Sequence, residues 1–184
     1  AAVFAAAERF FALPAAEKSR VAIERIGNNR GYAGLGTEAL DPTRPADLKE
    51  AFNIGLDLPA DHPDIVGGVP FRGLNGWPDL PGFRETLIAY FEACQALGAR
   101  LHRAFAIDLG LPPDHFAAAI DRPMSTLRLL HYPPHPADAR PGQLGAGDRV
   151  LALKLDVKRK EDFEAALAAV LAKWGEVHVV VNNA

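Results

Sequence analysis

The chain has 184 residues, of which 49% are hydrophobic and 23% charged, and its formal net charge is −3 at pH 7. This length allows one packed domain, or a domain and a fragment, and excludes two complete catalytic domains, since domains cluster at about 100–150 residues. The slightly acidic balance gives no electrostatic reason to expect nucleic acid or an anionic membrane as a partner, so a small-molecule ligand is expected.

The N-terminal segment does not have the pattern of a signal peptide. Residues 1–13 are apolar, but Glu8 and Arg9 interrupt them and no basic region precedes them. No apolar run approaches the roughly 20 residues that span a bilayer, so a cytoplasmic protein is expected. The single cysteine, Cys94, lies among apolar neighbours. It is interpreted as a small core residue, and a reactive thiol is the less favoured alternative.

In the first two thirds of the chain, the sequence predicts two helices, then a loop-rich segment, then a third helix. Residues 3–13 predict a helix that ends at Pro14, and residues 15–26 a second helix that ends at Gly27. Residues 28–82 are rich in Gly, Pro and Asp and predict loops and short strands. Residues 83–109 predict a long helix with one buried stripe, formed by Phe83, Leu87, Phe91, Cys94, Leu97, Leu101 and Phe105.

The pattern changes after this helix and again near Asp148. Residues 114–120 predict a short helical turn, and residues 125–132 a strand that ends at two prolines. The final segment predicts strand, helix and strand within about 35 residues, which is typical of a right-handed crossover unit. These three elements are expected at residues 150–157, 161–174 and 177–181.

Candidate metal ligands are histidines that lie close to carboxylates, because a mononuclear iron site needs two imidazoles and a carboxylate. His62 and Asp64 have the spacing His-x-Asp, but a proline-rich loop does not hold both on one face, and a surface turn is favoured. His131 and His135 are four residues apart, yet the prolines between them exclude a helix. No metal site is predicted from these residues.

Three glycines imitate a nucleotide-binding loop. Gly31, Gly34 and Gly36 follow a predicted helix end, whereas a dinucleotide fingerprint follows a strand and has a different spacing. A flexible turn is therefore the favoured interpretation.

Several motifs in order carry a family resemblance. The segments are 29–32 (NRGY), 75–78 (NGWP) and 128–134 (RLLHYPP), with the long helix between the last two. Together they resemble the isopenicillin N synthase-like family of iron(II) and 2-oxoglutarate-dependent oxygenases over residues 1–147. The resemblance implies a helical N-terminal region on a double-stranded β-helix, and it implies that the Tyr132 hydroxyl binds a carboxylate of the co-substrate or substrate. A phenol at a strand end suits that role, and a core-capping tyrosine is the alternative.

The sequence departs from that family after residues 141–147. The His-x-Asp of the family should follow there, and its second histidine and its 2-oxoglutarate-binding arginine later, but all are missing. Iron(II) and 2-oxoglutarate are therefore cofactors of the parent family that are not expected to bind here, and no catalytic residue is assigned.

Residues 148–184 resemble instead the middle of a short-chain dehydrogenase/reductase. The resemblance implies that Asp156 contacts the adenine of NAD(P) and that Asn182 lies beside the adenosine ribose. Asp156 is alternatively a helix-entry residue. The glycine-rich turn and the Tyr-x-x-x-Lys pair of that family are missing, so at most weak NAD(P) binding is expected.

The sequence thus predicts an α+β molecule in two parts. Residues 1–147 are expected to form a helical region with an incomplete double-stranded β-helix (jelly roll), and residues 148–184 a Rossmann-like strand–helix–strand segment. The expected parent function is oxidation of a small organic substrate, without turnover by this chain. A nucleotide-binding dehydrogenase fragment and a non-catalytic fusion stay open. An exposed strand at residues 177–181 would favour self-association.

Overall fold

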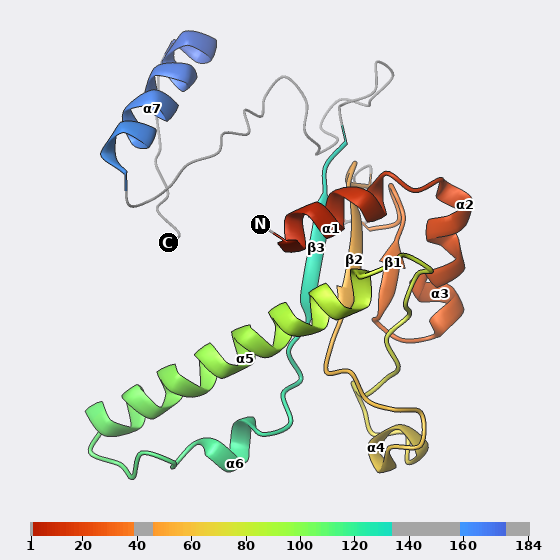
Figure 1. Cartoon of the computed structure of the whole chain (residues 1–184), viewed down its shortest axis with the longest axis vertical. Coiled ribbons are helices and arrows are strands. Elements are labelled where there is room, and N and C mark those ends of the chain that lie inside the picture. Colours follow the sequence, from red (N-terminus) through yellow and green to blue (C-terminus); the bar gives the residue numbers. More distant parts are fainter. Residues whose placement is uncertain (1, 39–45, 134–158, 176–184) are drawn as a thin grey trace.

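The computed structural model of the chain describes residues 2–38, 46–133 and 159–175 (Figure 1). Mixed helix and sheet, as predicted, make up these parts. The elements follow in the order α1 Ala2–Phe11, α2 Ala15–Lys18, η1 Ser19–Val21, α3 Ile23–Ile26, β1 Gly31–Ala33, β2 Glu50–Ile54, α4 Pro63–Val66, α5 Phe83–Asp108, α6 Ala117–Ile120, β3 Leu127–His131 and α7 Lys160–Trp174.

The helix predicted for residues 15–26 is broken into three short pieces. Ala22 interrupts it with an extended backbone, φ −65° and ψ 144°, and forms a parallel bridge to Tyr32. Gly27 ends the last piece in the left-handed conformation, φ 76°, as the sequence indicated. The prediction of one continuous helix was wrong, because the pairing of Ala22 with Tyr32 cannot be recognised from the spacing of apolar residues.

The three described strands form one antiparallel sheet with the order β1-β2-β3. Tyr32, Phe52 and Leu129 are Cα partners across it, and Glu50 pairs with His131 at one end. Because side chains alternate between faces, Tyr32, Phe52 and Leu129 point to the same side. The other edge of β3 has no strand beside it among the described residues.

Aromatic rings fill the space between the sheet and the helices α1 and α5, which cross it in Figure 1. Phe10 of α1 is fully buried at the centre. Its ring centroid lies 4.7 Å from that of Phe52 and 5.1 Å from that of Phe83. Such pairs add to the free energy gained from burial alone. The core therefore ties the N-terminal helix, the middle strand and the start of the long helix together.

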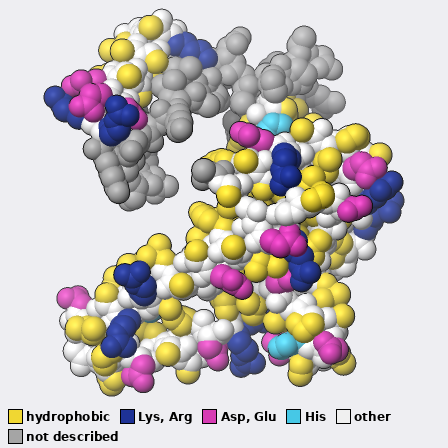
Figure 2. Space-filling view, in the orientation of Figure 1, with side chains coloured by type: hydrophobic (Ala, Val, Ile, Leu, Met, Phe, Trp, Pro, Cys, Tyr) yellow, Lys and Arg dark blue, Asp and Glu magenta, His cyan; other side chains and the backbone are white. Residues whose placement is uncertain are grey.

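The long helix α5 is confirmed, but its predicted apolar stripe is buried only over the first three turns, and Ala106 is the one further buried residue near its end. Phe83, Leu87 and Phe91 belong to the core, whereas Leu97, Leu101 and Phe105 are about half exposed. Cys94, predicted to lie in the core, is also exposed. Figure 2 shows hydrophobic side chains on the surface along this helix. Periodicity identified the apolar stripe, but it could not tell how far along the helix a partner extends.

Helix α7 confirms the helix predicted for residues 161–174, and Gly175 ends it with φ 79°. The strands predicted for residues 150–157 and 177–181 lie outside the described ranges. Within the described parts, no helix has both the length and the apolarity needed to cross a membrane.

Candidate functional site

Tyr132 follows directly on β3 and is about half exposed. Strand alternation places it on the side opposite His131. Lys49, which precedes β2, interacts electrostatically with the Tyr132 hydroxyl. Lys49 is itself paired with Asp47 at 2.7 Å and lies 3.8 Å from Glu38. The structure therefore presents an accessible phenol at the end of a strand, and a phenol can donate a hydrogen bond to a carboxylate.

Behind this strand end lies a buried cluster centred on Glu50, whose side chain is 3% exposed. The Lys18 ammonium and the Tyr32 hydroxyl each donate to Glu50 Oε2 at 2.6 Å. His131 Nδ1 lies 2.7 Å from Oε1. Lys18 also donates to the Phe11 carbonyl at 3.1 Å, so the cluster joins α1, α2 and all three strands.

Burial alone would raise the pKa of the Glu50 carboxyl, but the hydrogen bonds from Lys18, Tyr32 and His131 together hold this pKa below its ordinary value. The pKa of the Tyr32 hydroxyl is raised by burial and by its bond to Glu50. The carboxylate is therefore ionised and the phenol neutral near pH 7. Both oxygens of the carboxylate are engaged within the cluster, which joins the ends of the three strands.

The NGWP motif at residues 75–78 is anchored to the end of β2 through Asp57. Asn75 and Trp77 donate to Asp57 Oδ1 at 2.8 and 3.2 Å, and Arg84 donates to Oδ2 at 2.8 Å. Asn75 also bonds to both backbone groups of Gly55. These contacts fix the loop between β2 and α5, which is a structural reason for the motif.

The NRGY motif forms the start of β1. Gly31, interpreted from sequence as part of a flexible turn, lies instead in a strand with φ 102°. A Cβ atom there would meet the Val21 carbonyl oxygen at 2.3 Å, so only glycine allows this close approach. The neighbouring Asn29 accepts a 3.1 Å hydrogen bond from the fully buried Asn53. The Asn53 amide oxygen has no partner among the described residues.

The described residues do not supply the donor set of an iron site. No three His, Cys, Asp or Glu side chains converge within the described ranges. His62 and Asp64, which have the His-x-Asp spacing, lie at the start of the four-residue helix α4, where His62 Nδ1 accepts from the Asp64 N–H. His131 is engaged with Glu50, and His135 lies outside the described residues.

In a comparison with known families, residues 1–80 match the family model described as non-haem dioxygenase in morphine synthesis N-terminal. The 2-oxoglutarate-Fe(II) type oxidoreductase hxnY of Emericella nidulans is 36% identical over 140 residues, which are 74% of this chain and 40% of that protein. The 2-oxoglutarate-dependent dioxygenase citB of Monascus ruber is 38% identical over 152 residues, 78% of this chain and 45% of that protein. The chain thus spans less than half the length of these curated relatives.

Solved structures agree with these relatives. A 2OG-Fe(II) oxygenase family protein from Caulobacter crescentus matches with a TM-score of 0.62 and 34% identity, over 75% of this chain and 44% of that one. A full-length Neurospora crassa protein, solved in complex with alpha-KG, matches with a TM-score of 0.56 and 32% identity, over 77% and 44%. These matches support the 2-oxoglutarate–iron(II) oxygenase family. The resemblance stated from the oxygenase motifs is confirmed to that extent.

The dehydrogenase resemblance receives no support from these comparisons. Asp156 and Asn182, the two residues that it assigns to NAD(P), lie outside the described ranges, and α7 is the one described element of that segment. The Asp156 and Asn182 assignments stay predictions.

Sequence reasoning missed the buried polar residues of the oxygenase-like part. Glu50 and Lys18 were not singled out, and neither was the partly buried Asp57, although Glu50 stands next to the buried strand residues 51–54. A charged residue at the start of a buried strand is a usable signal, since a charge is buried only when it is paired. Its partners, at positions 18, 32 and 131, are too far apart in sequence to be inferred from spacing.

Proposed function

We propose that this chain forms the N-terminal part of an iron(II)- and 2-oxoglutarate-dependent oxidoreductase that acts on a small organic substrate. The observation that carries the proposal is the match to the Caulobacter crescentus oxygenase family protein, which extends over three quarters of the chain at 34% identity. In this proposal the sheet β1-β2-β3 belongs to a jelly roll, which continues at the edge of β3 that has no described neighbour. Residues 1–147 are taken as this domain.

Tyr132 is proposed to donate a hydrogen bond to a carboxylate of 2-oxoglutarate. Support comes from its place at the strand end and its half-exposed side chain. Bound iron and 2-oxoglutarate would supply the oxidising chemistry. This chain would supply a positioned phenol, whose strand is held by the Glu50–His131 contact.

We further propose that this chain does not turn over alone, because neither its sequence motifs nor its described residues provide the iron ligands. The test is an anaerobic titration with iron(II) and 2-oxoglutarate, followed through the charge-transfer absorption of the ternary complex. No such band is expected. A band that saturates at one iron per chain would overturn the proposed inactivity.

The role of Tyr132 is tested separately by titrating 2-oxoglutarate alone into the full chain. Without the iron ligands and the arginine of the family this binding should be weak, and the Tyr132 hydroxyl is proposed to contribute to it. Tyr132→Phe removes one hydrogen bond to a carboxylate and should weaken that binding by about tenfold or more. Tyr90→Phe is the matched control, because Tyr90 is equally exposed but lies on α5. Equal binding by Tyr132→Phe and the unchanged chain would contradict the role.

The dehydrogenase-like alternative for residues 148–184 has its own test. Saturable NAD(P) binding that is lost in Asp156→Ala would support it. NAD(P) binding that is unaltered in Asp156→Ala, or absent from both the unchanged chain and the variant, would exclude this alternative.

A further inference from the structure

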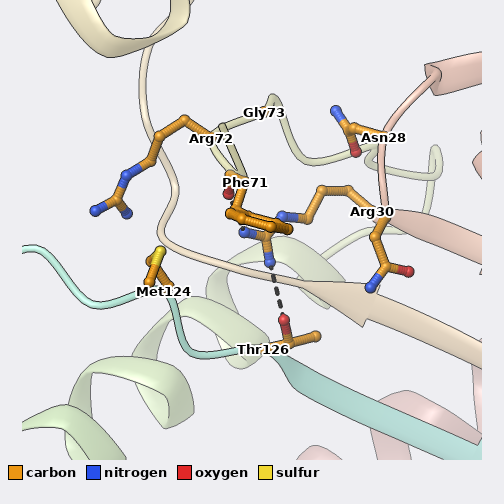
Figure 3. A pocket seen from close by; sticks show the side chains of 8 residues that line it. Asn28, Arg30, Phe71, Arg72, Gly73, Met124 and Thr126 are labelled. Atoms are coloured by element: carbon orange, nitrogen blue, oxygen red, sulfur yellow. Dashed lines mark hydrogen bonds between the residues drawn. The ribbon is translucent and has the colours of Figure 1, made fainter. Parts of the chain in front are cut away.

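A cavity of about 540 Å³ opens at the end of the sheet far from Tyr132. It lies between the start of β1, the loop after α4 and the segment that leads into β3 (Figure 3). This volume is in the range of small-molecule sites. Its lining includes Asn28, Arg30, Phe71, Arg72, Met124 and Thr126.

Arg30 is a buried cation without a counter-ion among the described residues. It is 6% exposed. Its guanidinium donates to Thr126 Oγ1 at 3.4 Å and to the Phe71 carbonyl at 3.3 Å, both near the long end of the hydrogen-bond range. Burial, and secondarily the charge of Arg72, lowers the pKa of Arg30. An unpaired buried charge is costly, so this side chain favours an anion.

Arg72 contributes charge but is already anchored. Its guanidinium donates to the backbone carbonyls of Pro123 and Arg122 at 2.8 and 2.6 Å, and its Nε lies 3.6 Å from Asp64 Oδ2. Asp64 therefore offsets Arg72. Arg30 is left as the one uncompensated charge of this described cavity lining, which favours a ligand with a single negative charge.

Two glycines make room for the polar side chains of the cavity. A Cβ at Gly55 would meet Arg30 Nη1 at 1.8 Å, and one at Gly73 would meet Asn28 Nδ2 at 2.3 Å. The Asn28 side-chain oxygen is buried and has no partner among the described residues. Arg30 and Asn28 thus lie in the cavity wall, and Arg30 is the charged group that a ligand can pair with.

The remaining walls are apolar. Phe71 is 80% exposed and holds a left-handed backbone, φ 62°, which is rare for a bulky residue. In Figure 3 the Arg30 side chain ends beside Phe71 and points to Thr126, and Met124 lies across the cavity. An exposed aromatic ring on a strained backbone favours a flat apolar partner over water.

We propose that this cavity binds a small carboxylate with a flat apolar body, its carboxylate on Arg30 and its body against Phe71 and Met124. The site is distinct from the one proposed at Tyr132. Thr126 and Tyr132 stand at opposite ends of β3, about 20 Å apart at 3.3 Å per residue. The proposal therefore does not depend on co-substrate binding.

The test is a ligand-observed NMR titration of the full chain with benzoate, and with its neutral isostere benzamide, at constant ionic strength. Benzoate is expected to bind saturably and about tenfold or more tightly than benzamide, the fold-change of a lost charge-assisted hydrogen bond. Equal affinities, or no saturable benzoate binding, would overturn the proposal.

Variants locate the site. Arg30→Gln should abolish the preference for benzoate.

Met124→Glu tests the location of the site even if Arg30→Gln does not fold. It places a negative charge, like that of benzoate, at the cavity mouth and changes only an exposed side chain. Leu109→Glu is the matched control, since Leu109 and Met124 are both 65% exposed and Leu109 lies outside the cavity. Met124→Glu should weaken benzoate about tenfold and Leu109→Glu should not. Equal effects of these two variants would overturn the location.

Discussion

His131 Nδ1 lies 2.7 Å from Glu50 Oε1, and the two residues are Cα partners in the β2–β3 register. Tyr132 is the next residue, so the position of its phenol depends on this pair. Lys18 and Tyr32 hold the other oxygen of the same carboxylate. The strand end that carries the proposed co-substrate contact is therefore fixed by a carboxylate that is itself shielded from solvent.

Replacing Glu50 with glutamine should destabilise the fold by about 3 kcal/mol, because the buried Lys18 ammonium loses its counter-ion. Urea unfolding measures this change. Glu17→Gln is the matched control: its partner Arg20 is mostly exposed, so its loss should change the free energy of unfolding by less than about 0.5 kcal/mol. Similar values for the two variants would show that the cluster does not stabilise the fold.

The same carboxylate predicts a pH dependence. The folded-state pKa of Glu50 is lower than its unfolded value, so its contribution to stability is present above the unfolded pKa, about 4.3, and is lost as the pH falls through the folded value. The difference in unfolding free energy between the natural chain and Glu50→Gln should therefore be largest near neutral pH and shrink below about pH 4. A difference that grows on acidification would contradict this sign.

Two phenylalanines of α1 provide a matched test of the core. Phe10 is fully buried and Phe4 is 78% exposed on the same helix. Phe10→Ala should cost about 3–5 kcal/mol through lost burial and a cavity, and Phe4→Ala less than about 0.5 kcal/mol. Chemical unfolding of both variants checks the contrast, and comparable losses would place the core elsewhere.

The left-handed backbone of Phe71 predicts a gain in stability from glycine. Phe71→Gly should be more stable than Phe71→Ala by about 1 kcal/mol, since both lack the ring and only alanine retains the Cβ that disfavours this conformation. Thermal unfolding compares the two. A more stable alanine variant would mean that residue 71 is not left-handed in solution.

The apolar stripe of α5 beyond Phe91 predicts self-association at high concentration. Leu97→Lys together with Leu101→Lys should lower the apparent mass in light scattering and leave the unfolding free energy nearly unchanged, because both side chains are about half exposed. The same change at the buried Leu87 should instead unfold the chain. An association that persists in the double variant would point to another surface, such as the strand predicted at residues 177–181.

The sequence predicted the fold where a signal is local. The period of apolar residues identified α5 almost to the residue, and the prolines and Gly27 marked helix ends. It failed where distant parts meet. Ala22 is extended because it pairs with Tyr32, and Leu97 is exposed because no described element covers it. Neither fact can be read from neighbouring residues.

The candidate site divides in the same way. Tyr132 was identified through an ordered set of motifs, and the structure places it at a strand end with a half-exposed side chain. Arg30 belongs to one of the motifs, but the surroundings of its guanidinium are formed by Phe71 and Thr126, which are 41 and 96 residues away in the chain. Burial of a charge is a tertiary property, and composition carries no trace of it.

The Arg30 guanidinium occupies the space that a side chain at position 55 would need. A larger residue at position 55 would therefore have to push the guanidinium away from its present place, although the two positions lie far apart in the chain. The anion preference proposed for this cavity thus depends on the smallest residue of the loop after β2 as well as on the arginine itself.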